Sequence, residues 1–414
     1  SSDLENVMNQ LSNEQNKNTY SQTRKPTSVM LIIGIIFIAA NLRAPLTSVG
    51  PLVSLIRGDL HISNALAGMI TTIPLFIFAL VSPFAPSLGR KYGTRLVVFC
   101  SAIFLTIGII LRSLSGGIGL FVGTAILGLA ISVCNVLIPS LIKQDFSKRI
   151  GIMMGVFSVS MNTFGAMASG ISIPIATRLG WSGSLGIWAS LSFITIILWI
   201  PQLKVRNQGV ATVQKQVGKN INIWKSTLAW QVALFMGLQS LVFYSMVAWL
   251  PYILINQGMS SNKAGWMLSL MQLALIPFTF IVSVLAGRKS NQRSLVTIGS
   301  LCIIIGISGL LNGNSTLAFL WIIILGIGGG FTFSLSMIFF SLRTENADEA
   351  ARLSGMAQSI GYLLAAFGPM LFGFLHDATN SWTTPLIMLI GVTVLCFIFG
   401  LGASRNLYVG SSLK

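Results

Sequence analysis

Arg43 is the residue whose surroundings point most directly to chemistry, because it lies near the middle of an apolar run from about residue 29 to 56. A run of that length can cross a bilayer as a helix, which needs about 20 residues. A guanidinium at that depth costs roughly 2.5 kcal/mol or more on insertion scales. We therefore predict that Arg43 faces a wet cavity, a partner or a ligand. The alternative is a structural arginine that backbone carbonyls satisfy at a kink.

Three neighbours of Arg43 strengthen this prediction. Pro45 has no N–H, so the carbonyl of Asn41, four residues earlier, loses its helical partner. Thr47 follows Arg43 by four residues, so these two side chains share one face of the helix. Lipid cannot accommodate a charge, a free carbonyl and an amide within one turn, whereas a translocation cavity can.

The composition indicates an integral membrane protein. The 414 residues have a mean hydropathy of +0.81, and only 8% are charged, against about 25% in soluble proteins. The net charge of +17 is better explained by the positive-inside rule than by a nucleic-acid partner. The four cysteines lie in apolar runs without close spacing, so we predict buried thiols and neither a metal site nor a disulfide framework; they are Cys100, Cys134, Cys302 and Cys396. No cofactor is predicted.

Twelve apolar runs are predicted to span the membrane, in an all-α fold. They lie near 29–56, 65–88, 96–114, 118–142, 150–176 and 184–200, and near 228–256, 264–286, 295–311, 317–341, 350–375 and 384–402. Residues 29–201 and 228–404 are predicted to form two six-helix bundles. The polar segments are predicted to be a disordered cytoplasmic tail (1–28), a cytoplasmic linker (202–227) and a cytoplasmic C-terminal tail (405–414).

Basic residues indicate the orientation. With the N-terminus inside, 21 of the 26 Lys and Arg residues fall on the inner side and Arg43 lies within a span. The outer side holds Arg57, Arg112, Arg178 and Lys263. This bias predicts a multi-pass protein of the cell membrane with both termini in the cytoplasm.

An internal repeat divides the chain into halves of equal topology. The pattern Gly89-Arg90-Lys91, with Arg95 four residues after Lys91, recurs 198 residues later as Gly287-Arg288-Lys289 with Arg293. Both copies follow the second span of their half. Two parallel repeats around an axis along the membrane normal are typical of rocking transporters. The alternative is that the basic loops are topology signals alone.

Twelve spans, a central loop and basic loops after spans 2 and 8 resemble the major facilitator superfamily. Three stretches resemble its cyanate and 2-nitroimidazole transporter branch: Asn41-Leu42-Arg43-Ala44-Pro45-Leu46-Thr47, Asn135-Val136-Leu137-Ile138-Pro139 running to Lys143-Gln144-Asp145-Phe146, and Ser354-Gly355-Met356-Ala357-Gln358-Ser359 followed by Gly361-Tyr362-Leu363. The resemblance implies that residues of these two basic loops take part in gating. The candidates are Gly89, Arg90, Lys91, Gly93 and Arg95 in the first loop, and Gly287, Arg288, Lys289 and Arg293 in the second. The loop of the superfamily usually carries an Asp before its basic pair. Aligned on Gly93, that position is Arg90 in this sequence.

The resemblance also implies where a substrate would bind, since the first, fourth, seventh and tenth spans line the cavity of this superfamily. The polar and aromatic candidates there and on span 11 are Asn41, Arg43, Thr47, Asn135, Gln239, Tyr244, Trp249, Ser334, Gln358 and Tyr362. Single amide and hydroxyl side chains in spans also commonly join helices to one another. Tyr244 and Trp249 could instead belong to an interfacial aromatic belt.

This set of groups favours a small, flat anion or a strongly dipolar solute over a cation. All nine acidic residues fall in tails, loops or span ends, so no carboxylate lies mid-membrane as a proton relay. We predict facilitated transport, or transport coupled through the protonation of the substrate. Neutralising Asp59 and Asp377, the acids near His61 and His376, should then leave accumulation intact.

The sequence therefore predicts a secondary active or facilitative carrier, acting as a monomer by alternating access. Its substrate would be a small anionic or nitro-heteroaromatic solute, similar to cyanate or 2-nitroimidazole. The alternative is a multidrug efflux carrier of the same fold for apolar drugs. An enzyme is not indicated, because the sequence contains no catalytic triad pattern, metal-ligand cluster or nucleotide-binding loop.

Overall fold

The computed structural model describes residues 25–62, 64–114, 116–204, 222–313 and 317–410. Most of the predicted N-terminal tail and linker, and the last four residues, lie outside the described residues. Helices account for nearly all of the described chain, and no strand occurs in it.

The first half of the chain contains α2 (Lys25–Thr47), α3 (Val53–Leu60), α4 (Asn64–Val81), α5 (Ala85–Tyr92), α6 (Thr94–Leu114), α7 (Gly116–Asp145), α8 (Ile150–Gly186) and α9 (Trp188–Leu203). The second half contains α11 (Thr227–Asn256), α12 (Ser261–Arg288), α13 (Arg293–Leu311), α14 (Ala318–Leu342), α15 (Ala347–Thr379) and α16 (Thr383–Ala403). Short 3-10 helices lie at η1 (Gly50–Leu52), η2 (Ser147–Arg149) and η3 (Ile223–Lys225).

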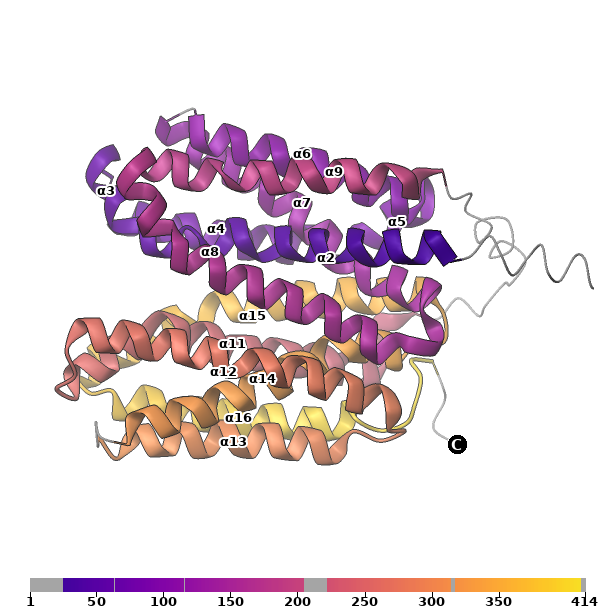
Figure 1. Cartoon of the computed structure of the whole chain (residues 1–414). Helices are drawn as coiled ribbons and strands as arrows, with labels where there is room; N and C mark the ends of the chain where they lie inside the picture. Colours follow the sequence, from indigo (N-terminus) through magenta and orange to yellow (C-terminus); the bar gives the residue numbers. More distant parts are fainter. Residues whose placement is uncertain (1–24, 63, 115, 205–221, 314–316, 411–414) are drawn as a thin grey trace, which may run out of the picture.

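The helices confirm the predicted twelve spans. Ten helical segments of the described chain are long and apolar enough to cross a membrane, and α4 with α5 form one more span that is bent by 58°. One of the ten segments, residues 147–203, contains both α8 and α9, which run in opposite directions and so count as two spans (Figure 1).

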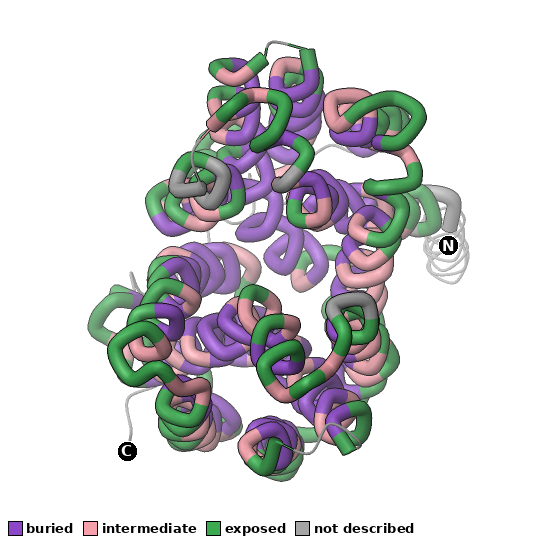
Figure 2. The backbone as a smooth tube through the Cα atoms, turned by 90° about the vertical axis from the view of Figure 1, so that its left-hand side faces the viewer, coloured by how far each residue is buried: buried purple, intermediate pink, exposed green. Residues whose placement is uncertain are grey.

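The twelve spans form two bundles of six. In Figure 1 the helices up to α9 form the upper group and those from α11 onward form the lower group, with the helices of both groups roughly parallel to one another. Helix α2 begins, and the chain after α16 leaves, at the same end of the molecule (right in Figure 1), which we call the terminal end. Figure 2, which views the helices from the other end, shows exposed residues around the rim and buried residues inside and between the groups.

Two breaks within the helices lie at proline or glycine residues. The second span bends between α4 and α5, where Pro83 and Pro86 remove backbone donors. Helix α8 passes Gly180 with φ of 70°, a left-handed conformation that glycine tolerates, and this residue marks the turn between spans 5 and 6. The first span is shorter than predicted, since α2 ends at Thr47 and η1 and α3 follow.

The prediction that all four cysteines are buried was wrong for two of them. Cys134 and Cys396 are buried, but Cys100 is exposed and Cys302 is half-buried, because an apolar run does not show which face of a helix turns outward. Arg112, predicted for the outer side, lies in the last turn of α6 and is fully buried, and its Nη1 donates to the carbonyl of Pro45 at 2.7 Å. It thereby satisfies a carbonyl near the end of α2.

Candidate functional site

A small cavity surrounds the guanidinium of Arg43 at the border of the two bundles. Its volume is about 20 Å³, enough for about one water molecule. The lining residues come from α2, α8, α11, α12, α14 and α15: Arg43, Asn162, Met236, Gln239, Ser240, Phe243, Tyr244, Leu275, Phe333, Met337 and Tyr362. Both halves of the chain therefore build the cavity, and Arg43 and Asn162 are the contribution of the first half.

Among the residues that the structure describes, aromatic rings and no acid hold Arg43. Its guanidinium carbon lies 5.5 Å from the ring centroid of Phe333 and 5.9 Å from that of Phe243, within the range of cation–π attraction. Its Nη1 lies 3.5 Å from the hydroxyl of Tyr244. Arg43 is half-buried, its Nε has no hydrogen-bond partner, and it enters no ion pair with any described residue. No carboxylate of the described residues therefore neutralises this positive charge.

Thr47 and Asn41 fix the position of α2 beside this cavity. The hydroxyl of Thr47 lies 2.8 Å from the carbonyl of Gly165 on α8 and 3.1 Å from that of Arg43. The amide of Asn41 donates to the hydroxyl of Thr195 on α9 at 2.8 Å. These contacts tie α2 to its neighbours within the first bundle, and neither side chain lines the cavity.

The structure brings four of the ten predicted substrate residues together. Gln239, Tyr244 and Tyr362 line the cavity with Arg43. The amide of Gln239 donates to the hydroxyl of Ser240 at 2.8 Å, so one polar pair faces the same space. Tyr362 packs edge-on against Phe78 with centroids 4.9 Å apart, which orients its ring.

The other six lie outside the cavity, where several of them join helices. The amide of Gln358 donates to the carbonyl of Asn135 at 2.9 Å and so connects the two bundles. Ser334 contacts Ser283 at 2.7 Å, joining α14 to α12. Trp249 donates from its indole to the carbonyl of Pro369 at 2.9 Å, joining α11 to α15. With Asn41 and Thr47, these residues match the helix-joining alternative.

The sequence did not single out several lining residues, although a signal for some was present. Met236, Gln239, Ser240 and Phe243 follow one another at spacings of three, one and three residues, which places them on one face of α11. Phe333 and Met337 are four residues apart on α14. Phe243 follows Gln239 by four residues, so extending the helical face of Gln239 along α11 would have identified Phe243 as well. Asn162 is an amide within an apolar run, as Asn135 is, but it lies on the fifth span, which is not among the four that the resemblance implies line the cavity.

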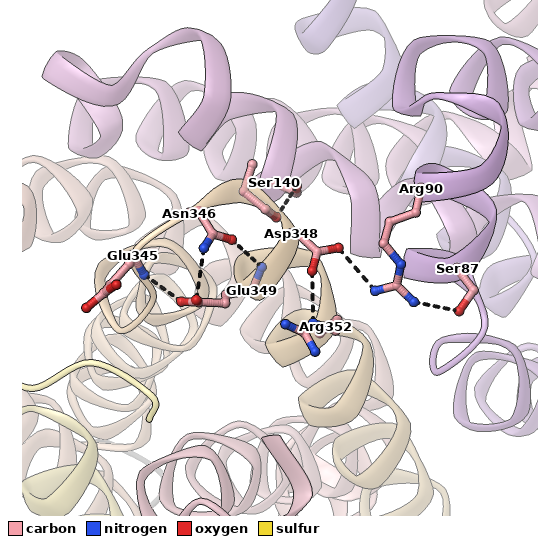
Figure 3. Close-up of polar contacts among 9 residues, drawn as sticks. Ser87, Arg90, Ser140, Glu345, Asn346, Asp348, Glu349 and Arg352 are labelled. Atoms are coloured by element: carbon pink, nitrogen blue, oxygen red, sulfur yellow. Dashed lines mark hydrogen bonds and ion pairs between the residues drawn. The ribbon is translucent and has the colours of Figure 1, made fainter. Parts of the chain in front are cut away.

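The basic loop after α4 and α5 contacts the opposite bundle at the terminal end. Nη1 of Arg90 pairs with Oδ1 of Asp348 at 3.1 Å, and Nε of Arg352 pairs with Oδ2 of the same carboxylate at 3.1 Å (Figure 3). Arg95 pairs with Asp145 at 2.8 Å within the first bundle. Gly93, with φ of 87°, ends α5 in a conformation that favours glycine.

Further contacts close the terminal end between the bundles. Lys143, at the end of α7, donates to the carbonyls of Ser341 and Thr344, the former at 2.6 Å. Such a cation is favourable near the carbonyl end of α14. The hydroxyl of Ser140 donates to the carbonyl of Ala347 at 2.6 Å (Figure 3). A Cβ on Gly151 of α8 would lie 3.1 Å from Cα of Gly287, so these two helices approach closely.

The corresponding loop in the second half is built differently. Arg288, Lys289 and Arg293 are exposed, and none enters an ion pair with a described residue. Arg343, which follows Asp145 by 198 positions, is buried and donates to the side chain of Gln292 and to the carbonyl of Ala403 at 2.8 Å. Burial lowers the pKa of Arg343 to about 10. The charge pattern of the two halves is therefore not symmetric.

The family model of the Major Facilitator Superfamily matches residues 29–369 and 250–406. The chain belongs to the major facilitator superfamily. The uncharacterized transporter YycB of Bacillus subtilis is 46% identical over 398 residues, covering 95% of this chain and 98% of that protein. The 2-nitroimidazole transporter of Escherichia coli is 38% identical, covering 91% and 96%, and the cyanate transport protein CynX of the same organism is 24% identical, covering 89% and 97%.

A solved structure of the superfamily has the same fold. The proton:xylose symporter XylE aligns with a TM-score of 0.75 at 12% identity, covering 93% of this chain and 98% of that chain. As a member of the superfamily, this chain is a multi-pass membrane transporter of small molecules. The relatives confirm the resemblance to the cyanate and 2-nitroimidazole transporter branch.

Proposed function

We propose that this transporter carries a small anionic or nitro-heteroaromatic solute by alternating access, with Arg43 as its anion-binding group. The observation that carries the proposal is the guanidinium of Arg43, which lies between the rings of Phe243 and Phe333 and pairs with no carboxylate in the described part of the chain. Nη1 contacts the hydroxyl of Tyr244, and Nε has no hydrogen-bond partner among the described residues, so the guanidinium keeps donors for a ligand.

The lining chemistry suits a flat, negatively charged or strongly dipolar molecule. A guanidinium donates two parallel hydrogen bonds to a carboxylate, nitro or nitrate group, and these charge-assisted bonds are stronger than neutral ones. The rings of Phe243, Phe333 and Tyr362 offer faces on which a heteroaromatic ring can stack. The named activities of two relatives, transport of 2-nitroimidazole and of cyanate, fit these requirements.

Alternating access would rock the two bundles around this cavity. We propose that the terminal end faces the cytoplasm, because the basic residues are concentrated there. In the present conformation, Lys143, Ser140 and the pair Arg90–Asp348 join the bundles at that end. We assign these contacts to the cytoplasmic gate, with Asp348 supplying the acid that the loop lacks.

Transport would need no protein carboxylate for coupling. The residues lining the cavity include no Asp or Glu. Asp59 accepts a hydrogen bond from the indole of Trp181 at 2.7 Å, and Asp377 pairs with its neighbour His376 at 3.1 Å. Both acids lie outside the cavity lining, so a variant with Asp59→Asn and Asp377→Asn should retain accumulation.

The experiment is a thermal-shift screen of the purified protein against cyanate, nitrate, 2-nitroimidazole and a lipophilic cation. At least one of the first three should stabilise the wild type. Arg43→Ala should weaken the affinity for that ligand by about 10- to 150-fold, because a hydrogen bond to a charged group is worth ~1.5–3 kcal/mol. Arg43→Lys should retain part of this affinity. The matched control is Arg178→Ala, which changes an exposed arginine outside the cavity. Equal ligand responses in Arg43→Ala and the wild type would refute the role of Arg43.

The alternative, a multidrug efflux carrier for apolar drugs, has one supporting observation. Met236, Met337 and Leu275 form an apolar part of the lining, and methionine adapts to ligands of different shape. An efflux carrier of this kind should respond to apolar drugs or lipophilic cations and keep that response in Arg43→Ala.

A further inference from the structure

Helix α15 lies at the border of the two bundles and turns one face toward the first bundle (Figure 1). Four residues share this face, because they follow one another at spacings of three, one and three residues; they are Gly355, Gln358, Ser359 and Tyr362. The first three meet backbone carbonyls of the first bundle, and Tyr362 lines the cavity around Arg43.

The amide of Gln358 donates to a carbonyl that a proline leaves free. Pro139 lies inside α7 and has no N–H, so the carbonyl of Asn135, four residues earlier, loses its helical donor. Nε2 of Gln358 donates to this carbonyl at 2.9 Å and to the hydroxyl of Ser354 at 2.8 Å. The donor that α7 lacks is therefore supplied by the other bundle.

The hydroxyl of Ser359 does the same for a second carbonyl. Pro83 follows Ala79 by four residues, at the bend between α4 and α5, and removes the N–H that would continue the helical pattern. Oγ of Ser359 donates to the carbonyl of Ala79 at 2.6 Å. Two consecutive residues of α15 therefore satisfy carbonyls on two different helices of the first bundle.

Gly355 approaches a third carbonyl of this kind. Pro86 follows Ser82 by four residues, and a Cβ on Gly355 would lie 2.7 Å from the carbonyl oxygen of Ser82. A side chain at this position would push α15 away from the bend, whereas glycine lets the two backbones meet. This close approach, one turn before Ser359, brings its hydroxyl within reach of the first bundle.

Closure of the terminal end requires these donors for a physical reason. A buried carbonyl without a donor costs free energy, whereas a carbonyl that lines a water-filled cavity can accept from water. Asn135 and Ala79 are both buried in the present conformation, at 5% and 7% exposed. Parting the bundles would give their carbonyls to water, and closing them again requires a donor from the protein.

We propose that Gln358 and Ser359 form a latch, which stabilises the closed terminal end by donating to the carbonyls that Pro139 and Pro83 leave free. Neither Gln358 nor Ser359 lines the cavity, so both are positioning residues that do not touch the substrate. The internal repeat does not copy this latch, because the positions 198 residues after the two prolines are Met337 and Ile281.

The same face of α15 connects the latch to the cavity. Tyr362 lies one turn beyond Gln358 and packs against Phe78 with ring centroids 4.9 Å apart, and Phe78 directly precedes Ala79. A ligand held between Arg43 and Tyr362, one from each bundle, would draw α15 toward the first bundle and favour the latched conformation. This consequence rests on the function proposed above, whereas the latch itself does not.

Spin labels at Lys91 and Lys289, exposed residues of the two bundles, measure closure in the ligand-free full chain. Gln358→Met keeps the length of the side chain but removes the donor, so the closed population should fall by about tenfold, as expected when a buried acceptor loses its partner. Gln358→Glu should lower it further, because carboxylate oxygens would face the carbonyl. The matched control is Gln257→Met, which removes an amide bond to the carbonyl of Leu310 at 2.8 Å within the second bundle and should leave the label distance unchanged.

A double-variant cycle separates the latch from a general packing role. Pro139→Ala restores the backbone N–H, so the carbonyl of Asn135 regains a donor within α7 and no longer needs Gln358. In this background, Gln358→Met should change the closed population by less than about threefold. Ser359→Ala acts on a different carbonyl, so it should lower the closed population by the same factor in the wild type and in Pro139→Ala.

Equal effects of Gln358→Met in the two backgrounds would overturn the proposal. An unchanged label distance in both Gln358→Met and Gln358→Glu would also overturn it.

A ligand arm tests the connection to the cavity. Addition of 2-nitroimidazole should shorten the label distance in the wild type, and should do so less in Gln358→Met. If 2-nitroimidazole raises the thermal stability of the wild type without changing this distance, the connection to the cavity is wrong. If neither 2-nitroimidazole nor the small anions of the screen bind, the function proposed above fails, whereas the ligand-free distances still decide whether the latch exists.

Discussion

The guanidinium of Arg43 lies among aromatic rings, and this environment determines which ligands can approach it. A carboxylate partner would cancel the charge and leave the cavity suited to neutral molecules. The rings of Phe243 and Phe333 attract the cation through their faces without neutralising it. The side chain is thus positioned while its charge remains available.

Phe333→Leu tests whether the rings serve the ligand site. The change removes a cation–π contact worth ~1 kcal/mol, so affinity for an anion that stabilises the wild type should fall by about fivefold. The measurement is the ligand concentration that gives half of the maximal thermal shift. Phe331→Leu is the matched control on the same helix, because Phe331 stacks against Phe278 with centroids 5.9 Å apart and does not line the cavity. Equal losses in both variants would indicate a general effect on α14.

At this scale the sequence predicted the charge but only part of its surroundings. Arg43 stood out because a cation in an apolar run is costly. Gln239, Tyr244 and Tyr362 were also among the predicted residues, and the structure places them beside Arg43. The sequence could not separate Ser334 and Trp249, which lie outside the cavity, from these lining residues. Helices that are apolar on all sides carry no pattern that shows which face turns inward.

Close packing of α8 against α12 brings the bundles together at the terminal end. A Cβ on Gly151 would lie 2.7 Å from the carbonyl oxygen of Ser283, which is closer than real Cβ atoms approach. Gly287 in turn faces Gly151, and a Cβ there would lie 2.7 Å from its Cα. Small residues at such a crossing let the backbones meet without side chains between them.

Gly151→Ala should therefore oppose closure of the terminal end. Overpacking typically costs ~1–3 kcal/mol, which corresponds to a roughly 5- to 150-fold shift away from the closed population. The distance between spin labels at Lys91 and Lys289 should lengthen, and transport should fall. Gly170→Ala is the matched control, since it adds the same methyl group to α8 where no atom lies within 4 Å. An unchanged label distance in Gly151→Ala would show that this crossing does not limit closure.

The elements themselves were largely predictable, while their breaks were not. Twelve apolar runs of bilayer length predicted the spans, because hydrocarbon demands about 20 apolar residues per helix. The 58° bend between α4 and α5 and the turn at Gly180 lie inside or beside apolar sequence. Proline and glycine permit such breaks, but packing against neighbouring helices decides where they form.

Across the whole molecule, the contacts between bundles depend on charges that the internal repeat does not copy. Arg90 pairs with Asp348 from the other half, whereas Arg288, its counterpart, is exposed without an ion pair among the described residues. The sequence showed that the usual loop acid is missing. It could not show that Arg90 pairs with an acid more than 250 residues away, since that contact exists only after both bundles have formed.

Exchanging the charges of Arg90 and Asp348 tests this contact as a gate. Arg90→Asp should place two carboxylates together and weaken closure, and Asp348→Arg should place three arginines together with the same result. For a partly exposed pair the effect is about 1 kcal/mol, or roughly fivefold in the closed population. The double variant Arg90→Asp/Asp348→Arg should restore the closed population and transport, because the new acid then lies beside two arginines.

The matched control for the exchange is Arg288→Asp, the same change at the equivalent position of the second half. It should leave the label distance and transport near the wild-type values, because Arg288 forms no ion pair with a described residue. If the single variants lose transport and the double variant does not recover it, residues 90 and 348 affect transport for a reason other than the attraction between their charges. Recovery in the double variant alone would show that charge pairing across the two halves, and not the order of residues in the loop, closes the terminal end.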